Sequence, residues 1–240
     1  MSASDHPPIG LGPGYLRTEF LERIAHELRG PAGVTSGALD EIDLAVSADA
    51  TQLREYLGMA RRGVQRVLRV AERLQRTAQL ERGQVEWAMA PTDLRRVVEQ
   101  AASQAGLLEG RRGVRVDVSC SDDPCPVSVD PAWIRFSVAE LVGNAIRFAR
   151  SATTVECSIS GDEVTVTIAD DGPGFARAPA NRFEPPLDRR GVGLSLHLVR
   201  DAVAAHGGRL ELDAARGSGE AELSGARVVL ALPRAERSGR

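Results

Sequence analysis

Residues 163–175 read Glu-Val-Thr-Val-Thr-Ile-Ala-Asp170-Asp-Gly172-Pro-Gly174-Phe, a strand pattern that passes directly into a glycine turn. Apolar and hydroxyl side chains alternate over the first part, as expected for a strand with one buried face. The alternate glycines Gly172 and Gly174 let a flat ligand approach the backbone without meeting Cβ atoms. The carboxylate of Asp170 can accept a hydrogen bond from an exocyclic amine such as that of adenine. The alternative interpretation is a tight Gly-Pro-Gly turn without a ligand.

A mixed pattern of strands and helices surrounds this stretch. Alternating runs predict strands at 114–119, 127–130, 153–160, 163–169, 209–212 and 226–232. Helical spacing predicts helices at 92–104, 131–149 and 193–206. Either Thr92 or Asp93 is the expected N-cap of the first of these helices.

The N-terminal part of the chain has helical periodicity alone. A helix is predicted over 15–46, with a kink at Pro31 because apolar residues resume beyond it. A second helix, 51–82, repeats apolar residues at steps of four and three in a heptad seam formed by Leu53, Leu57, Ala60, Val64, Val67, Ala71 and Leu74. Because one hairpin of two helices has too little core to stand alone, we expect a homodimer with a four-helix bundle.

Composition narrows the class of protein. The chain has 240 residues, 42% hydrophobic and 26% charged, and its net charge of −3 gives no reason to expect a nucleic-acid partner. No apolar run approaches the ~20 residues of a spanning helix, and the N-terminus does not resemble a signal peptide, so we expect a cytoplasmic protein without membrane insertion. The three cysteines fit no common zinc spacing and are interpreted as reduced thiols.

A candidate nucleophile lies in the first predicted helix. Residues 20–31 read Phe-Leu-Glu-Arg-Ile-Ala-His26-Glu27-Leu-Arg-Gly-Pro31. A histidine followed by a glutamate places a phosphate acceptor beside a base that can orient it. The alternative is a solvated histidine on a helix surface.

The predicted helix 131–149 carries a candidate metal ligand. Glu140 and Asn144 are one turn apart and share a face, and Arg147 and Phe148 follow. An amide oxygen is a hard ligand suited to Mg²⁺, which takes few protein ligands together with phosphate oxygens and water. The alternative is a buried asparagine that caps neighbouring backbone.

A second glycine segment, Gly191-Val-Gly193-Leu194-Ser-Leu, opens the predicted helix 193–206. Free N–H groups and the helix dipole at such a start favour phosphate. The segment lacks the Gly-Lys-Ser/Thr of a P-loop, and a glycine-rich helix entry without ligand is the alternative. The proline- and arginine-rich stretch 177–190 before it resembles a loop over a ligand site, and Arg190 there is a candidate phosphate contact.

Five short motifs in order resemble the H, N, G1, F and G2 boxes of two-component sensor histidine kinases. They are His-Glu-x-x-x-Pro, Asn-x-x-Arg-Phe, Asp-x-Gly-x-Gly, Arg-Phe-Glu-Pro-Pro and Gly-x-Gly-Leu-x-Leu, within residues 15–233. The resemblance implies an α+β chain in which a dimeric phosphoacceptor hairpin precedes a two-layer α/β sandwich that binds ATP. The expected parts are an arm (1–14), the hairpin (15–82), a hinge (83–91), the ATP-binding domain (92–234) and a tail (235–240).

The resemblance also implies a role for each matching residue. His26 is the phosphoacceptor, Glu27 its acid/base neighbour and Asn144 the Mg²⁺ ligand. The implied nucleotide contacts are Asn144, Arg147, Phe148, Asp170, Gly172, Gly174, Phe183 of the lid, Arg190, Gly191, Gly193 and Leu194. The implied reaction passes the γ-phosphoryl of ATP to His26 and then to an aspartate of a response regulator.

The chain departs from the family pattern at three points. Glu140 stands where many members have Asn, and Gly30 replaces a usual Thr or Asn, which predicts little phosphatase activity. No sensory or membrane segment is recognisable, so a separate sensory protein or the N-terminal arm is the expected source of the signal. Two other functions remain open: a histidine phosphotransfer or scaffold protein with weak or no kinase activity, and an ATP-driven clamp with Glu140 as hydrolytic base.

Overall fold

The computed structural model of the chain describes residues 19–44, 50–81, 83, 85–109, 113–175, 194–214 and 225–235. The chain falls into two compact units, of which the first contains the N-terminal helices as far as Leu74 and the second begins at Gln75. None of the helices within the described ranges is long and apolar enough to span a lipid bilayer.

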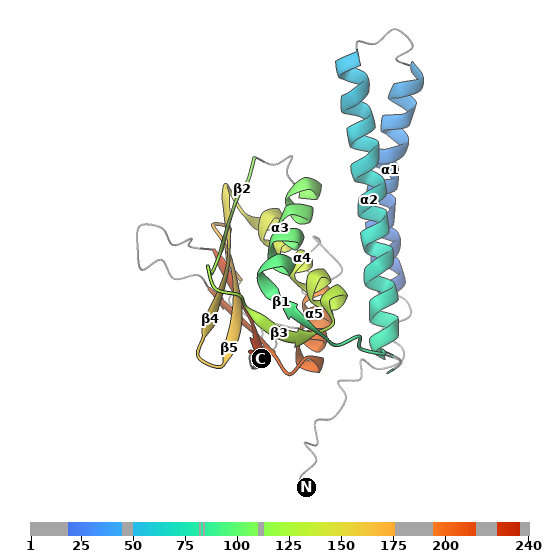
Figure 1. Cartoon of the computed structure of the whole chain (residues 1–240). Helices are drawn as coiled ribbons and strands as arrows, with labels where there is room; N and C mark the ends of the chain where they lie inside the picture. Colours follow the sequence, from blue (N-terminus) through green and yellow to red (C-terminus); the bar gives the residue numbers. More distant parts are fainter. Residues whose placement is uncertain are drawn as a thin grey trace. The chain divides into compact units, whose positions relative to one another are not determined.

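Two long helices, α1 (Glu19–Leu44) and α2 (Ala50–Glu81), form a hairpin at the N-terminal end of the chain, as the sequence predicts (Figure 1). The first unit contains α1 and the part of α2 up to Leu74. Helix α1 continues through Pro31. Proline has no N–H to donate one turn back, and its own carbonyl accepts a hydrogen bond from Thr35 Oγ1 at 2.9 Å.

The two helices approach each other closely at Gly63 of α2. A Cβ atom at this position would lie 1.9 Å from Thr35 Oγ1 and 2.9 Å from the Pro31 carbonyl oxygen of α1. The nearby residues Ala38 and Ala60 are also small and buried. Small side chains therefore permit the close approach of the two backbones at this level.

The predicted heptad seam of α2 is only partly covered within one hairpin. Ala60 is 8% exposed, whereas Leu53, Leu57 and Val64 are 37%, 46% and 47% exposed. Leu39 of α1 is likewise 49% exposed. A row of large apolar side chains thus stays on the hairpin surface.

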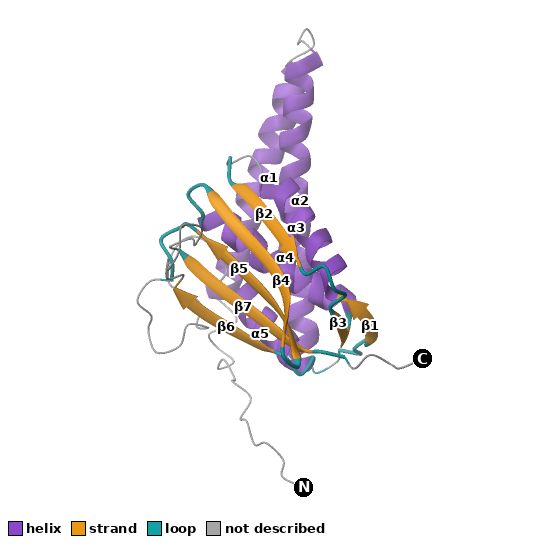
Figure 2. Ribbon diagram, turned by 60° about the vertical axis from the view of Figure 1, so that its left-hand side comes forward, coloured by secondary structure: helices purple, strands orange, loops and turns teal. Residues whose placement is uncertain are grey.

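The second unit is built on a five-stranded mixed sheet of order β2-β4-β5-β7-β6. Its strands are β2 (Arg115–Cys120), β4 (Ala152–Ser160), β5 (Glu163–Asp170), β6 (Arg209–Ala214) and β7 (Ala226–Pro233). Strands β2 and β4 are parallel, and the other neighbours are antiparallel. The helices α3 (Leu94–Glu109), α4 (Pro131–Phe148) and α5 (Leu194–Ala205) cover one face (Figure 2). This mixed α+β arrangement confirms the predicted class of the domain.

Strand alternation explains which face is covered. Val155 and Cys157 of β4 and Val164, Val166 and Ile168 of β5 are buried in the core, whereas Glu156 and Ser158 between them are exposed. Period-two patterning places one set against the helices and the other in solvent. The three cysteines are free thiols, and two of them, Cys125 and Cys157, are buried.

A short strand, β1 (Ala90–Asp93), replaces the predicted start of a helix at Thr92. It pairs antiparallel with β3 (Pro126–Val129), so α3 begins only at Leu94. Thr92 therefore lies in the strand, and Asp93 is the residue whose Oδ1 accepts from the N–H of Arg95 at 3.3 Å. The competing main-chain ladder with β3 overrides the helical spacing of the sequence.

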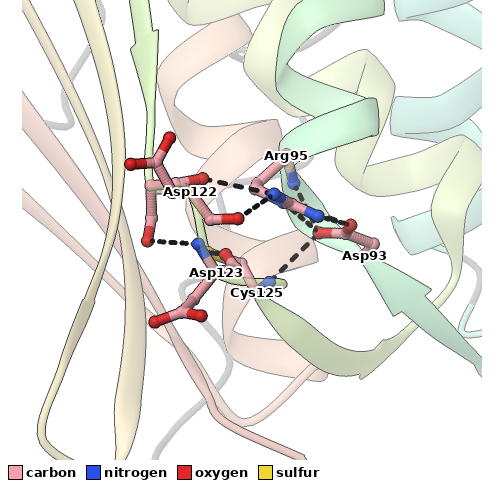
Figure 3. A network of polar contacts seen from close by, with 6 residues as sticks. Asp93, Arg95, Asp122, Asp123 and Cys125 are labelled. Atoms are coloured by element: carbon pink, nitrogen blue, oxygen red, sulfur yellow. Dashed lines mark hydrogen bonds and ion pairs between the residues drawn. The ribbon is translucent and has the colours of Figure 1, made fainter.

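Asp93 also organises the loop before β3. Its Oδ2 accepts from Arg95 Nη2 at 2.7 Å, and its Oδ1 accepts from the N–H of Cys125 at 3.1 Å (Figure 3). Arg95 Nη1 donates to the carbonyl oxygen of Asp122 at 2.8 Å. The hydrogen bond with Arg95 is the main cause of a pKa of Asp93 below its ordinary value. The network ties the start of α3 to the loop.

The segment predicted as a hinge has specific contacts within the second unit. The ring of Trp87 lies 5.1 Å from that of Trp133 and 4.9 Å from that of His206. The N–H of Ala88 donates to Asp130 Oδ2 at 3.1 Å. Residues 85–89 are therefore anchored on α4 and the end of α5, and a hinge within 83–91 remains a prediction.

The close contact at Gly63 gives a testable contrast in stability. Gly63→Ala should lower the free energy of unfolding by about 1–3 kcal/mol, because its methyl group overlaps Thr35 and Pro31. Gly37→Ala should raise it by up to ~1 kcal/mol, since no atom lies within 4 Å of the added Cβ and alanine favours the helix. Thermal unfolding of both full-length variants at one fixed protein concentration checks this. Equal shifts in the two variants would contradict the close approach.

Candidate nucleotide site

Helix α4 positions the first group of predicted site residues. Asp130 caps it by accepting from the N–H groups of Ala132 and Trp133 at 3.0 and 3.3 Å, and Pro131 fits the first turn. Glu140, 2% exposed, lies in the middle of α4, and the half-buried Asn144 lies one turn further on. The shared helix face predicted for this pair is therefore present.

Asn144 is oriented by the arginine that follows it. Arg147 Nη2 donates to Asn144 Oδ1 at 2.8 Å, and the guanidinium carbon lies 5.1 Å from the centre of the Phe148 ring. An amide oxygen is an acceptor of the kind that hard cations also use as a ligand. In the described part of the chain no group of three or more His, Cys, Asp or Glu residues is placed to hold a metal.

The end of β5 presents Asp170 as a buried carboxylate, 4% exposed. Its Oδ1 accepts from the N–H of Gly172 at 2.8 Å and from the N–H of Ala226 at 3.3 Å. Within the described residues, Oδ2 accepts no hydrogen bond. Burial raises the pKa of Asp170 above its ordinary value, and the two N–H groups oppose that shift only partly. The carboxylate is fixed through one oxygen, and the other is left to a partner.

Glycines make the surroundings of Asp170 possible. A Cβ at Gly172 would lie 2.4 Å from the carbonyl oxygen of Phe148, the last residue of α4. A Cβ at Gly225 would lie 2.4 Å from both the main-chain oxygen and Oδ1 of Asp170. Gly174 has φ of 72°, a conformation in which side chains are strained. The glycine turn, the end of α4 and the start of β7 therefore meet at Asp170.

The neighbouring Asp171 holds the connection between α4 and β4. Its Oδ1 accepts from the N–H groups of Arg150 and Ser151 at 2.7 and 3.0 Å, and its Oδ2 accepts from Ser151 Oγ at 2.6 Å. Burial tends to raise the pKa of Asp171, but these hydrogen bonds outweigh it and hold the pKa well below the ordinary range. The carboxylate of Asp171 therefore stabilises the loop between α4 and β4. Its hydrogen-bond donors differ from those of Asp170.

Three residues of this site were missed by sequence reasoning. Gly225 and Ala226 approach Asp170 from β7, and Thr153 of β4 stands opposite Asp170 in the strand register. Gly225 follows residues without a clear pattern, and Thr153 is one more hydroxyl residue in an alternating strand. Only the pairing of distant strands identifies them.

The structure brings Asn144, Arg147, Phe148, Asp170, Gly172 and Gly174 into one region between the end of α4 and the end of β5. Phe183, Arg190, Gly191 and Gly193 lie outside the described residues. Leu194 is the first residue of α5, and His26 and Glu27 lie on α1, in each case with a side chain outside the described part.

Comparison with known families identifies the class of this domain. Residues 129–236 match the family described as histidine kinase-, DNA gyrase B-, and HSP90-like ATPase. The matched range contains α4, β5 and β7, which carry the site. Residues 129–236 are therefore a domain of that ATPase family.

Similarity over most of the chain narrows the class further. A sensor-like histidine kinase of Rhizobium meliloti is 26% identical over 219 residues, which are 85% of this chain and 41% of that protein. The sensor protein KdpD of Clostridium acetobutylicum is 27% identical over 208 residues, 82% of this chain and 23% of that protein. Over most of its length the chain is thus similar to these two sensor proteins, and it spans less than half the length of either.

Solved structures show the same architecture. Full-length ShkA in complex with AMPPNP is 25% identical with a TM-score of 0.60, over 92% of this chain and 47% of that one. The histidine kinase AdeS of Acinetobacter baumannii is 21% identical with a TM-score of 0.58, over 87% of this chain and 98% of that one. The fold of the described units is therefore that of histidine kinases.

The raised pKa of Asp170 predicts an unusual dependence of the free energy of unfolding on pH. Its raised pKa means that the carboxyl stabilises the folded state at low pH, and that this contribution is lost as pH rises through the folded-state pKa. Asp170→Asn cannot titrate but can still accept from Gly172. The variant should equal or exceed the wild type in stability at pH 7, and the wild type should gain on it as pH falls toward 4. Urea unfolding at several pH values checks this, and the opposite trend would show that Asp170 is stabilised as a carboxylate.

Proposed function

We propose that this protein is an ATP-dependent histidine autokinase of a two-component system. The observation that carries the proposal is the buried Asp170, which has one oxygen bound by backbone N–H groups and the other without a partner among the described residues. A carboxylate oxygen in such a setting suits an exocyclic amine, because a charge-assisted hydrogen bond is strong away from water. The glycines at 172 and 174 leave the backbone open to a flat base.

Asn144 would hold Mg²⁺ through its amide oxygen, with phosphate oxygens and water as the other ligands. The ion would supply positive charge beside the phosphates. Arg147 lies beside Asn144 and contributes a second cation. The remaining proposed nucleotide contacts are Phe148, Phe183, Arg190, Gly191, Gly193 and Leu194.

His26 is the proposed acceptor of the phosphoryl group. A neutral ring nitrogen attacks the γ-phosphorus of ATP, a nitrogen–phosphorus bond forms, and the bond to the bridging oxygen breaks so that ADP leaves. Glu27 orients the ring and stabilises the positive charge that develops on it. The reference pKa of histidine, about 6.5, keeps most of the ring neutral at cell pH. The phosphoryl group then passes to an aspartate of a response regulator.

The hairpin is the proposed dimerisation element. Leu53, Leu57 and Val64 remain 37–47% exposed on α2. Packing two hairpins into a four-helix bundle removes such a row from water, at about 25 cal/mol for each Å² of apolar surface. We propose a homodimer on this ground, with the signal delivered by a separate sensory protein or by the N-terminal arm.

Gly30 concerns a second activity, the dephosphorylation of the response regulator. It is exposed, and no atom lies within 4 Å of a Cβ built there, so a larger side chain would fit without a clash. Glycine offers no polar group to position water against a phosphorylated regulator. We propose on this ground that the protein has little phosphatase activity.

Asp170→Asn should weaken ATP binding at least about tenfold, because the charge-assisted hydrogen bond to the amine is lost. Isothermal titration calorimetry with magnesium and ATP measures the change. Asp162→Asn, in the exposed turn at the opposite end of β5, is the matched control and should bind as the wild type does. Equal affinities of Asp170→Asn and the control would reject the assignment of Asp170.

The test of the proposed activity is incubation with γ-labelled ATP and magnesium. The protein should acquire a label that is stable in base and lost in acid, as a phosphoramidate is. His26→Gln should abolish the label and leave ATP binding intact, because the acceptor is removed while the nucleotide site is unchanged. Labelling that persists in His26→Gln, or a label stable in acid, would contradict histidine phosphorylation at this residue.

A further inference from the structure

All three cysteines of the chain lie together in the second unit, and the nucleotide site described above uses none of them. Cys120 ends β2, Cys125 lies in the loop just before β3, and Cys157 is in the middle of β4. The side chains of Cys125 and Cys157 are 0% and 2% exposed and belong to one hydrophobic core. Cys120 packs against the same core. Three nucleophilic side chains are therefore gathered on the helix-covered face of the sheet.

Strand pairing brings Cys120 and Cys157 side by side. The two residues are register partners in the parallel pair β2–β4, and the N–H of Ser121 donates to the carbonyl oxygen of Cys157 at 2.8 Å. Paired strands lie about 4.8 Å apart, within the roughly 4.4–6.8 Å between Cα atoms that a disulfide requires. The thiol of Cys157 is also in hydrogen-bond contact with the thiols of Cys120 and Cys125. The sulfur atoms are therefore within reach of one another.

Exposure distinguishes Cys120 from the other two cysteines. Cys120 is half-buried, and its strand β2 is the edge strand of the described sheet. A small oxidant can therefore reach Cys120 from solvent, whereas the core encloses the thiols of Cys125 and Cys157. Among the residues that the structure describes, these three thiols do not form a metal site. The arrangement is that of one accessible thiol with a buried thiol beside it.

We propose that Cys120 and Cys157 are a redox-sensitive pair, in which a hydroperoxide oxidises Cys120 and Cys157 then closes a disulfide. In the first step the sulfur of Cys120 attacks a peroxide oxygen, the O–O bond breaks, and Cys120 becomes a sulfenic acid. In the second step the sulfur of Cys157 attacks that of Cys120, the S–S bond forms and the S–O bond breaks. With hydrogen peroxide, the two thiols lose two electrons and two protons, and the peroxide is reduced to two waters.

The surroundings of Cys120 determine how the reaction depends on pH. Burial raises the pKa of the Cys120 thiol above its ordinary value, and Glu99 and Arg95 of α3 act on this pKa in opposite directions. The other titratable groups beside it are the thiols of Cys125 and Cys157. Because the thiolate is the nucleophile, oxidation should be slow at neutral pH and about ten times faster one pH unit higher. The proposal does not rest on the kinase function, since no step uses the nucleotide site.

The experiment treats the full-length protein with hydrogen peroxide, blocks the remaining thiols with N-ethylmaleimide and maps disulfides by mass spectrometry without reduction. Cleavage with the protease Asp-N separates Cys120 from Cys125, because Asp122 and Asp123 lie between them. One linked pair of peptides should contain Cys120 and Cys157. Two of the three free thiols should disappear, and dithiothreitol should restore them.

Two variants separate the roles of the buried cysteines. Cys157→Ala should leave Cys120 as a sulfenic acid that dimedone traps, because the second thiol is missing. Cys125→Ala, the matched control in the same core, should form the disulfide as the wild type does. The map of the wild type decides the proposal even where a variant fails to fold. Three labelled thiols after prolonged exposure to peroxide, a bond between two chains, a bond that involves Cys125, or a rate independent of pH would overturn it.

Discussion

The burial of the Asp170 carboxylate is the constraint on which the site depends. A charged group that is 4% exposed loses most of its hydration, and two backbone N–H groups return only part of it, both to the same oxygen. The glycines at 172 and 225 are required because any side chain there would collide with Asp170 or with the end of α4. The folded protein therefore contains a destabilising buried carboxylate, and the glycines beside it leave the space that this carboxylate occupies. Such a local conflict with stability is typical of a functional site.

The two units differ in how completely they bury their apolar side chains. The α/β unit covers its sheet with three helices and builds a core around residues such as Val155, Ile168 and Leu230. The hairpin has a close contact at Gly63 but leaves Leu57 and Val64 about half exposed. An α/β unit with its own core and a helical unit with apolar side chains left at its surface agree with the kinase dimer proposed above.

Local features of the site could be predicted from the sequence. Each of these features has a sequence pattern only a few residues long: the strand that ends at Asp170, the glycines at 172 and 174, and the helix with Asn144. The positions of Thr153 and Gly225 beside Asp170 could not be predicted, because they follow from contacts with β5 that are not local in the sequence. Strand β1 was missed for a related reason: four residues carry too weak a pattern, and their pairing with β3 decides their structure. The roles of His26, Glu27 and Gly191 remain predictions from the sequence.

The central claim is that Asp170 recognises the exocyclic amine of adenine. The most direct measurement is the affinity of the wild type for ATP and for purine riboside triphosphate, which lacks only that amine. The analogue should bind at least about ten times more weakly, because Asp170 Oδ2 then faces the bound base without a donor. Asp170→Asn should reduce this difference between the two nucleotides. Equal affinity of the wild type for the two nucleotides would contradict the account.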